Sequence, residues 1–232
     1  MEGKYIIIEG PDGAGKDSLI DGLAKSFTLL GKSYSDFRKE FRKSPNDIIL
    51  ISEPSALETG QRVRELIKQK ASTEELARAF SDDRKNLIKN YIQPWLEMGK
   101  IIISGRSFIS SLVYQGHLIN IDYLLNLEGN KVAVENGADE IIIITSPLEQ
   151  LIKRINIRNN SKEFFEKKDF LKNVLNIYKN EKELMYKNKN LTLQELIKTL
   201  MPKTEIIYFD NSGPLEDLKK FSEETAEILL SN

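Results

Sequence analysis

Short apolar runs recur along the chain and are separated by longer stretches in which apolar and polar residues mix. Each run is continuous rather than alternating, which is typical of strands that a parallel sheet buries on both faces. The runs are Tyr5–Ile8, Ile48–Ile51, Ile101–Ile103, Ile141–Ile144 and Ile206–Phe209. The pattern therefore predicts five buried strands.

The stretches between the runs have apolar residues at helical spacing, as at Leu19, Leu23 and Phe27. Strands that alternate with helices are joined by right-handed crossovers and form one doubly wound sheet. No internal repeat or low-complexity linker interrupts the pattern. We therefore expect a single domain over residues 1–232, with a five-stranded parallel sheet between helices in a three-layer α/β/α arrangement.

The later part of the chain holds two strongly polar stretches. Arg158–Lys168 is expected to be a mobile loop, and Lys179–Asn190 a solvated helix end. Beyond them, Thr192-x-x-Glu195 has the form of a capping box, as Ser72-x-x-Glu75 does earlier. The second box predicts a short additional helix over Thr192–Leu200.

Composition narrows the classes of function. The 34 Lys and Arg residues balance 35 Asp and Glu residues, giving a net charge of −1, which argues against a protein that coats nucleic acid or an anionic membrane. The chain has no cysteine and a single histidine, His117. Disulfides, cysteine-ligated zinc, a cysteine nucleophile and paired-histidine chemistry are therefore excluded.

The first residues do not have the layout of a signal peptide. The longest apolar runs span four or five residues, far fewer than the roughly 20 that cross a bilayer. We therefore expect a cytoplasmic protein with neither membrane nor nucleic-acid partners.

The first apolar run leads directly into a glycine-rich segment. Gly10 to Lys16 fits the first seven positions of the pattern G-x-x-x-x-G-K. Glycines let the backbone curl so that its N–H groups form an anion nest, which the positive end of the next helix reinforces. Lys16 would add a charge on the β- and γ-phosphates. A bare glycine-rich turn would leave this lysine unexplained. The motif predicts a P-loop NTPase fold with an ATP site formed by Gly10, Asp12, Gly13, Ala14, Gly15, Lys16, Asp17 and Ser18.

A second motif follows the third apolar run. Residues 105–116 read GRSFISSLVYQG, which resembles the D-R-x-x-x-S-S-x-A-Y-Q-G segment of the thymidylate kinase family. Three further matches fall in the family's order: Glu53-Pro54 with Gly60-x-x-x-Arg64, Phe80 with Asp83-Arg84, and the segments Leu151–Arg158 and Phe165–Tyr178 on either side of its LID. The resemblance covers residues of about 4–180 and resumes at 204–230.

The resemblance implies phosphorylation of a deoxynucleoside monophosphate, dTMP above all, by ATP with Mg²⁺, in a homodimer. By position, Phe80 would stack on the base while Arg84, Ser111 and Gln115 recognise its edge. Tyr114 would crowd a ribose 2′-hydroxyl. An aromatic platform accepts any base, whereas hydrogen-bonding groups discriminate between bases.

The same resemblance assigns the phosphate side of the site. Arg64 and Arg106 would hold the acceptor phosphate, and Asp12 would accept from the sugar 3′-hydroxyl. Glu53 and Pro54 would belong to the substrate site, with Glu53 near metal-bound waters. The loop between Gly10 and Gly15 has no arginine, so the catalytic cation would come from a LID at about residues 154–168. Arg158 is the first candidate and Arg154 the second, because phosphoryl transfer needs charge neutralisation.

Two positions depart from the patterns together. Asp17 stands where a metal-binding Ser or Thr is expected, and Gly105 stands where the family has an Asp. One hypothesis is that Asp17 supplies the anionic metal contact that position 105 lacks, which suits the oxygen preference of Mg²⁺. The other is that Asp17 faces solvent, Ser18 or water serves the metal, and activity is reduced.

Other departures from the family's pattern leave the identity of the phosphate acceptor undecided. Ser55-Ala56-Leu57 replaces Gly-Gly-Thr, and the LID has Lys162-Glu163-Phe164 in place of the usual Asp-Arg pair. A kinase for another deoxynucleotide or a deoxynucleoside, or a nucleotide-binding relative with weak or no catalysis, therefore stays an alternative.

Overall fold

The computed structural model describes residues 3–38, 46–159 and 165–231, without the side chains of 158–159 and 165–167. Its centre is a parallel sheet in the order β2-β3-β4-β1-β5-β8. The strands are β1 (Lys4–Glu9), β2 (Tyr34–Asp36), β3 (Ile48–Ser52), β4 (Ile101–Gly105), β5 (Glu140–Thr145) and β8 (Glu205–Asp210).

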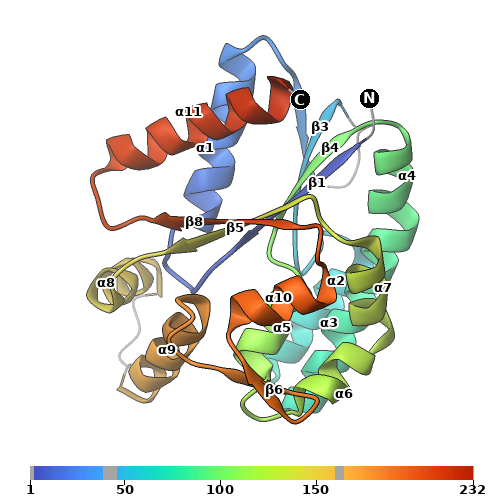
Figure 1. Cartoon of the computed structure of the whole chain (residues 1–232), viewed down its shortest axis with the longest axis vertical. Helices are drawn as coiled ribbons and strands as arrows, with labels where there is room; N and C mark the ends of the chain where they lie inside the picture. The colour runs from blue at the N-terminus through green and yellow to red at the C-terminus, as the bar shows by residue number, and fades with distance from the viewer. Residues whose placement is uncertain (1–2, 39–45, 160–164, 232) are drawn as a thin grey trace.

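Helices cover both faces of the sheet, as predicted (Figure 1). One face carries α1 (Lys16–Leu29) and α11 (Leu215–Ser231), which lie side by side. The other carries α3 (Thr73–Leu87), α5 (Phe108–Gln115), α7 (Glu128–Asn136) and α10 (Leu193–Leu200). The remaining helices are α2 (Glu58–Lys68), η1 (Ile88–Ile92), α4 (Gln93–Glu97), α6 (Ile121–Asn126), α8 (Leu148–Asn159) and α9 (Phe165–Tyr178).

The sheet separates two apolar cores because alternate strand residues point to opposite faces. Ile6 and Ile8 pack with α1 and α11, whereas Tyr5 and Ile7 pack with the helices of the other face. Burial on both faces explains the continuous apolar runs, and all five predicted strands are confirmed.

The prediction of five strands was incomplete, because β2 pairs with β3 as a sixth. It has three residues, of which Ser35 alone is buried, so no apolar run announces it.

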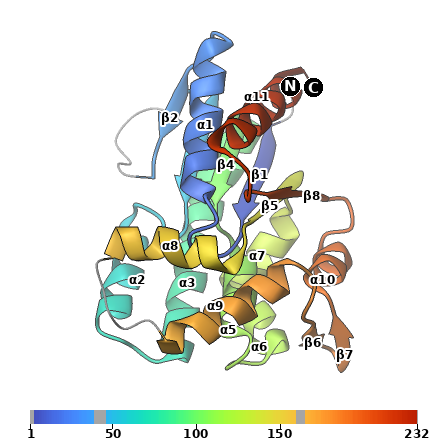
Figure 2. The same cartoon turned by 90° about the vertical axis from the view of Figure 1, so that its left-hand side faces the viewer.

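The prediction of a solvated helix end over Lys179–Asn190 was wrong. The segment forms most of a hairpin, with β6 (Leu184–Tyr186) antiparallel to β7 (Lys189–Leu191), beside α10 (Figure 2). Its two turn residues, Lys187 and Asn188, both have positive φ, as a tight hairpin requires. The turn has the sequence Lys-Asn instead of the Asn-Gly pair that usually marks such a hairpin, so the sequence did not predict it.

The expected helix after the hairpin is confirmed. It is α10, and Thr192 and Glu195 form a complete capping box at its start. The mobile loop expected at Arg158–Lys168 lies mostly outside the described residues.

Candidate active site

The P-loop joins the carboxyl end of β1 to α1, and its backbone fits only glycine at critical points. Gly10 and Gly15 have φ values of +147° and +106°. A Cβ on Gly10 would lie 2.1 Å from the carbonyl oxygen of Ile144, and one on Gly15 would lie 2.5 Å from Asn211 Nδ2. The loop therefore packs tightly against the ends of β5 and β8.

Lys16 is folded back onto the loop that precedes it. Its ammonium donates to the carbonyl oxygens of Gly10 and Pro11, both at 2.8 Å. Burial, reinforced by the charge of Arg106, lowers the pKa of Lys16 to about 7. A polyphosphate would supply the opposite charge that stabilises the ammonium form.

A phosphate cavity of about 150 Å³ opens beside the P-loop. Its lining combines the loop and α1 with the carboxyl ends of β3 and β4: Asp12, Gly13, Gly15, Lys16, Asp17, Ser52, Glu53, Gly105 and Arg106. Ligands of doubly wound sheets bind at these strand ends.

A larger acceptor cavity of about 340 Å³ adjoins it, and Asp12, Glu53 and Arg106 line both. The acceptor cavity is walled by α3 and α5 together with the turn after β3. Its other lining residues are Pro54, Ile67, Leu76, Phe80, Arg84, Ser107, Ser110, Ser111, Tyr114 and Gln115. The structure thus brings together nine of the ten predicted substrate-binding residues.

Arg106 lies between the two cavities. Its backbone has a left-handed φ of +76°, and its amide donates to Ile8 at 2.9 Å. The guanidinium pairs with Asp12, donates to Ser110 Oγ at 3.2 Å and lies over the ring of Tyr114. Tyr114 in turn accepts from the amide of Asp12 at 3.0 Å. These contacts hold a positive charge at the junction of the cavities.

Glu9, which was not among the predicted site residues, holds the residues around Arg106 in place through several hydrogen bonds. Its buried carboxylate accepts from the hydroxyls of Ser107, Ser110 and Tyr178, each at 2.8 Å, and from the amide of Ser110 at 3.2 Å. Ser110 thereby links Glu9 to Arg106. An acidic residue that ends a buried apolar strand was the available signal.

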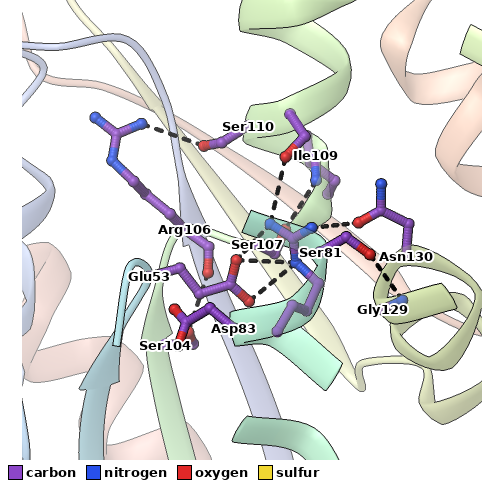
Figure 3. Close-up of polar contacts among 12 residues, drawn as sticks. Glu53, Ser81, Asp83, Ser104, Arg106, Ser107, Ile109, Ser110, Gly129 and Asn130 are labelled. Carbon is purple, nitrogen blue, oxygen red and sulfur yellow. Dashed lines mark hydrogen bonds and ion pairs between the residues drawn. The ribbon is translucent and has the colours of Figure 1, made fainter. Parts of the chain in front are cut away.

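Arg84 and Glu53 form a buried ion pair in the wall of the acceptor cavity. Figure 3 labels Glu53 among the polar residues of this region. Arg84 also donates to the side chains of Asn130 and, at 3.4 Å, Ser111. Burial raises the pKa of Glu53, to about 7, against the opposing effect of the Arg84 charge. Asn130, on α7, was missed because nothing in the sequence marks its proximity to Arg84.

Asp83 on α3 accepts from Ser55, in the turn after β3, and from Thr59, in the first turn of α2. Arg64 does not line either cavity. Its guanidinium donates to the carbonyl oxygens of Pro54 and Ser55, at 2.6 and 2.5 Å. Its role in holding a phosphate stays a prediction.

Gln115 lines the acceptor cavity and has one buried polar side-chain atom without a hydrogen-bond partner. In the described part of the chain, its Oε1 is the one buried side-chain polar atom that lacks a hydrogen bond. Nε2 donates weakly to the carbonyl of Thr73 at 3.4 Å. An unpaired buried acceptor costs about 1–3 kcal/mol, which a ligand N–H would recover.

A third cavity of about 360 Å³ lies on the other side of the P-loop. Ser18 and Arg154 line it, with Ile157, Asn211 and Leu215. Arg154 braces the loop, since it donates to the carbonyls of Gly13 and Asn211 at 3.2 Å. Arg158 is in α8, but its side chain lies outside the described residues. His117, the single histidine, is exposed.

Among the described residues, no three His, Cys, Asp or Glu side chains gather as a metal site formed by protein alone. The chemistry of the cavity nevertheless fits Mg²⁺, which binds one or two carboxylates together with substrate phosphates. Asp17 lines the phosphate cavity, whereas Ser18 lines the third cavity. Glu53 is engaged by Arg84.

No helix of the described segments is long and apolar enough to cross a membrane.

Comparisons with known proteins agree with this geometry. The family profile described as thymidylate kinase matches residues 8–200. A probable thymidylate kinase of Thermococcus onnurineus is 32% identical over 185 residues, covering 75% of this chain and 82% of the relative. A thymidylate kinase of Caldicellulosiruptor saccharolyticus is 29% identical over 219 residues, covering 90% and 98%. The chain therefore belongs to the thymidylate kinase family.

Proposed function

We propose that the protein transfers the γ-phosphoryl group of ATP to dTMP and releases ADP and dTDP. The observation that carries the proposal is the meeting of the phosphate and acceptor cavities at Asp12, Glu53 and Arg106. A kinase must place a donor phosphate and an acceptor phosphate in line, and this junction offers one space for both.

The transfer makes one bond and breaks one. A phosphate oxygen of dTMP attacks the γ-phosphorus, and the bond between that phosphorus and the bridging oxygen of ADP breaks. A phosphate monoester has a second pKa near 6, so the acceptor oxygen is largely ionised at neutral pH and needs no general base. The site therefore has to position two anions and neutralise their charge.

The residues divide this task. Lys16 and the P-loop amides bind the donor phosphates, while Arg106 neutralises charge where donor and acceptor meet. Mg²⁺ would supply further charge neutralisation on the donor phosphates when bound, and Asp17 would be the residue suited to hold it. Arg154 contacts the P-loop from the third cavity, so Arg158 stays our first candidate for a LID cation within residues 154–168.

Base selection rests on Phe80 and Gln115. Phe80 is half-buried in the cavity wall and offers a stacking surface. Gln115 Oε1 is a hydrogen-bond acceptor without a partner in the protein, which suits the N3–H of thymine or uracil and not the unprotonated N3 of cytosine. Tyr114 crowds a ribose 2′-hydroxyl. We further propose a cytoplasmic location, from the composition of the sequence, and a homodimer, which the family resemblance implies.

An acceptor panel tests the proposal. ATP and Mg²⁺ are supplied with dTMP, dUMP, dCMP, dGMP or thymidine, and ADP release is measured. We expect dTMP to give the highest kcat/KM, dUMP to follow, and thymidine to give none, because thymidine brings no phosphate to Arg106. Preference for thymidine would identify a nucleoside kinase. ATP binding without turnover of any acceptor would identify a non-catalytic relative, the reading that Asp17 and Gly105 allow.

A further inference from the structure

Asp17 occupies the position that follows the P-loop lysine, where the general pattern has a serine or threonine whose hydroxyl binds Mg²⁺. The side chain is exposed and lines the phosphate cavity, close enough to Lys16 for its charge to act on the ammonium. The next residue with a hydroxyl, Ser18, lines the third cavity. Asp17 therefore lines the phosphate cavity, and Ser18 does not.

Two further acidic residues, Asp12 and Glu53, line the phosphate cavity. Asp12 pairs with Arg106, and Glu53 pairs with Arg84. Opposite the P-loop, at the end of β4, Gly105 brings no side chain to the same cavity. A Cβ at that position would lie 3.0 Å from Ile20 Cδ1 and 3.6 Å from Ser52 Cβ, so the strand end accepts a side chain after a small shift of Ile20.

We propose that Asp17 is a direct ligand of the nucleotide-bound Mg²⁺, in place of the usual hydroxyl and of any acid at position 105. Mg²⁺ readily takes one carboxylate together with phosphate oxygens and water. The ligand set then consists of Asp17, the β- and γ-phosphates and water. This inference rests on the proposed ATP site.

The placement has a consequence that a hydroxyl would not have. Without metal, the negative Asp17 repels the polyphosphate beside it, whereas with metal it attracts the complex. ATP and Mg²⁺ should therefore bind with strong mutual dependence. Removing the charge should strengthen ATP binding in the absence of metal and weaken it in its presence.

The test is a binding cycle without acceptor, so that turnover does not interfere. The dissociation constant of ATP is measured by calorimetry in EDTA and in Mg²⁺, for wild type, Asp17→Asn and Ser18→Ala. We expect Asp17→Asn to bind metal-free ATP about threefold to tenfold more tightly, and Mg²⁺-ATP at least about tenfold more weakly. Ser18→Ala should leave the ratio of the two constants unchanged.

A second variant pair checks the geometry. Asp17→Thr restores the usual hydroxyl without the charge, so its metal dependence should be weaker than that of wild type, and Asp17→Thr with Gly105→Asp should regain it, with urea unfolding confirming that both fold. Electron paramagnetic resonance of Mn²⁺ in the ATP complex should differ between wild type and Asp17→Asn. The inference would be overturned if Asp17→Asn left the ratio of the ATP dissociation constants in EDTA and in Mg²⁺ unchanged. It would also be overturned if Ser18→Ala alone abolished the metal dependence of ATP binding. Failure of wild type to bind Mg²⁺-ATP would instead overturn the proposed function.

Discussion

The guanidinium of Arg84 lies 2.5 Å from the carboxylate of Glu53, and both groups are almost completely buried in the wall of the acceptor cavity. The family resemblance predicts that Arg84 recognises the edge of the base and that Glu53 lies near metal-bound waters. In the structure Arg84 and Glu53 pair with each other, and Arg84 also donates hydrogen bonds to the side chains of Asn130 and Ser111. The pair thus shapes the cavity from within the wall.

Breaking this pair should destabilise the fold more than removing it entirely. We expect Glu53→Leu and Arg84→Met each to lower the free energy of unfolding by about 3–5 kcal/mol, because each leaves one charge buried alone. The double variant should recover most of the loss while turning over dTMP poorly. Urea unfolding followed by circular dichroism measures this, and a double variant as unstable as the sum of the singles would contradict it.

Gln115 should affect acceptor recognition without supporting stability. We expect Gln115→Leu to lower kcat/KM for dTMP by about tenfold to a hundredfold, the worth of a hydrogen bond to a buried acceptor. Its melting temperature should change little, because Oε1 has no partner to lose and Nε2 makes only a long bond of 3.4 Å to the carbonyl of Thr73. Steady-state kinetics with dTMP and dCMP check this: an equal loss for both bases would show that Gln115 does not read N3–H.

Arg106 should tolerate lysine poorly. Its guanidinium contacts Asp12 and Ser110 at once, and a single ammonium cannot reproduce that fork. We expect Arg106→Lys to lower kcat by at least about a hundredfold, on the scale of losing one electrostatic stabiliser. Arg62→Lys, on the exposed side of α2, is the matched control and should leave kcat unchanged. Similar kcat values for the two variants would remove Arg106 from the site.

Two acidic residues lie opposite each other where β5 and β8 begin. Glu140 pairs in register with Glu205, and burial, followed by the charge of Glu205, raises the pKa of Glu140. A carboxyl with a higher pKa in the folded state binds more protons when folded, so stability falls as pH rises above the unfolded value of about 4.3.

We therefore expect Glu205→Gln to raise the free energy of unfolding at pH 7.5 by about 0.3–0.5 kcal/mol, with no gain at pH 4. Thermal unfolding at the two pH values measures this. Glu65→Gln, at an exposed position on α2, serves as the control. An equal gain at both pH values would mean that the charge of Glu205 is not the cause.

The sequence by itself determined the elements whose signals are local. The five apolar runs predicted the long strands because a strand buried on both faces must be apolar throughout. The glycines of the P-loop predicted its curl, and the capping box predicted α10, because these depend on residues a few positions apart. The three-residue β2 and the hairpin after α9 escaped because their signals are too weak to read locally.

Only the tertiary structure decided which groups meet. Glu9 contacts Tyr178 across 169 positions of chain, and Arg84 contacts Asn130 across 46, so sheet order and helix placement create these pairs. The structure also separated neighbours that the sequence leaves equivalent, since Asp17 and Ser18 line different cavities. Residue types and their spacing indicate which chemistry is available, but the direction of each side chain depends on packing between distant segments.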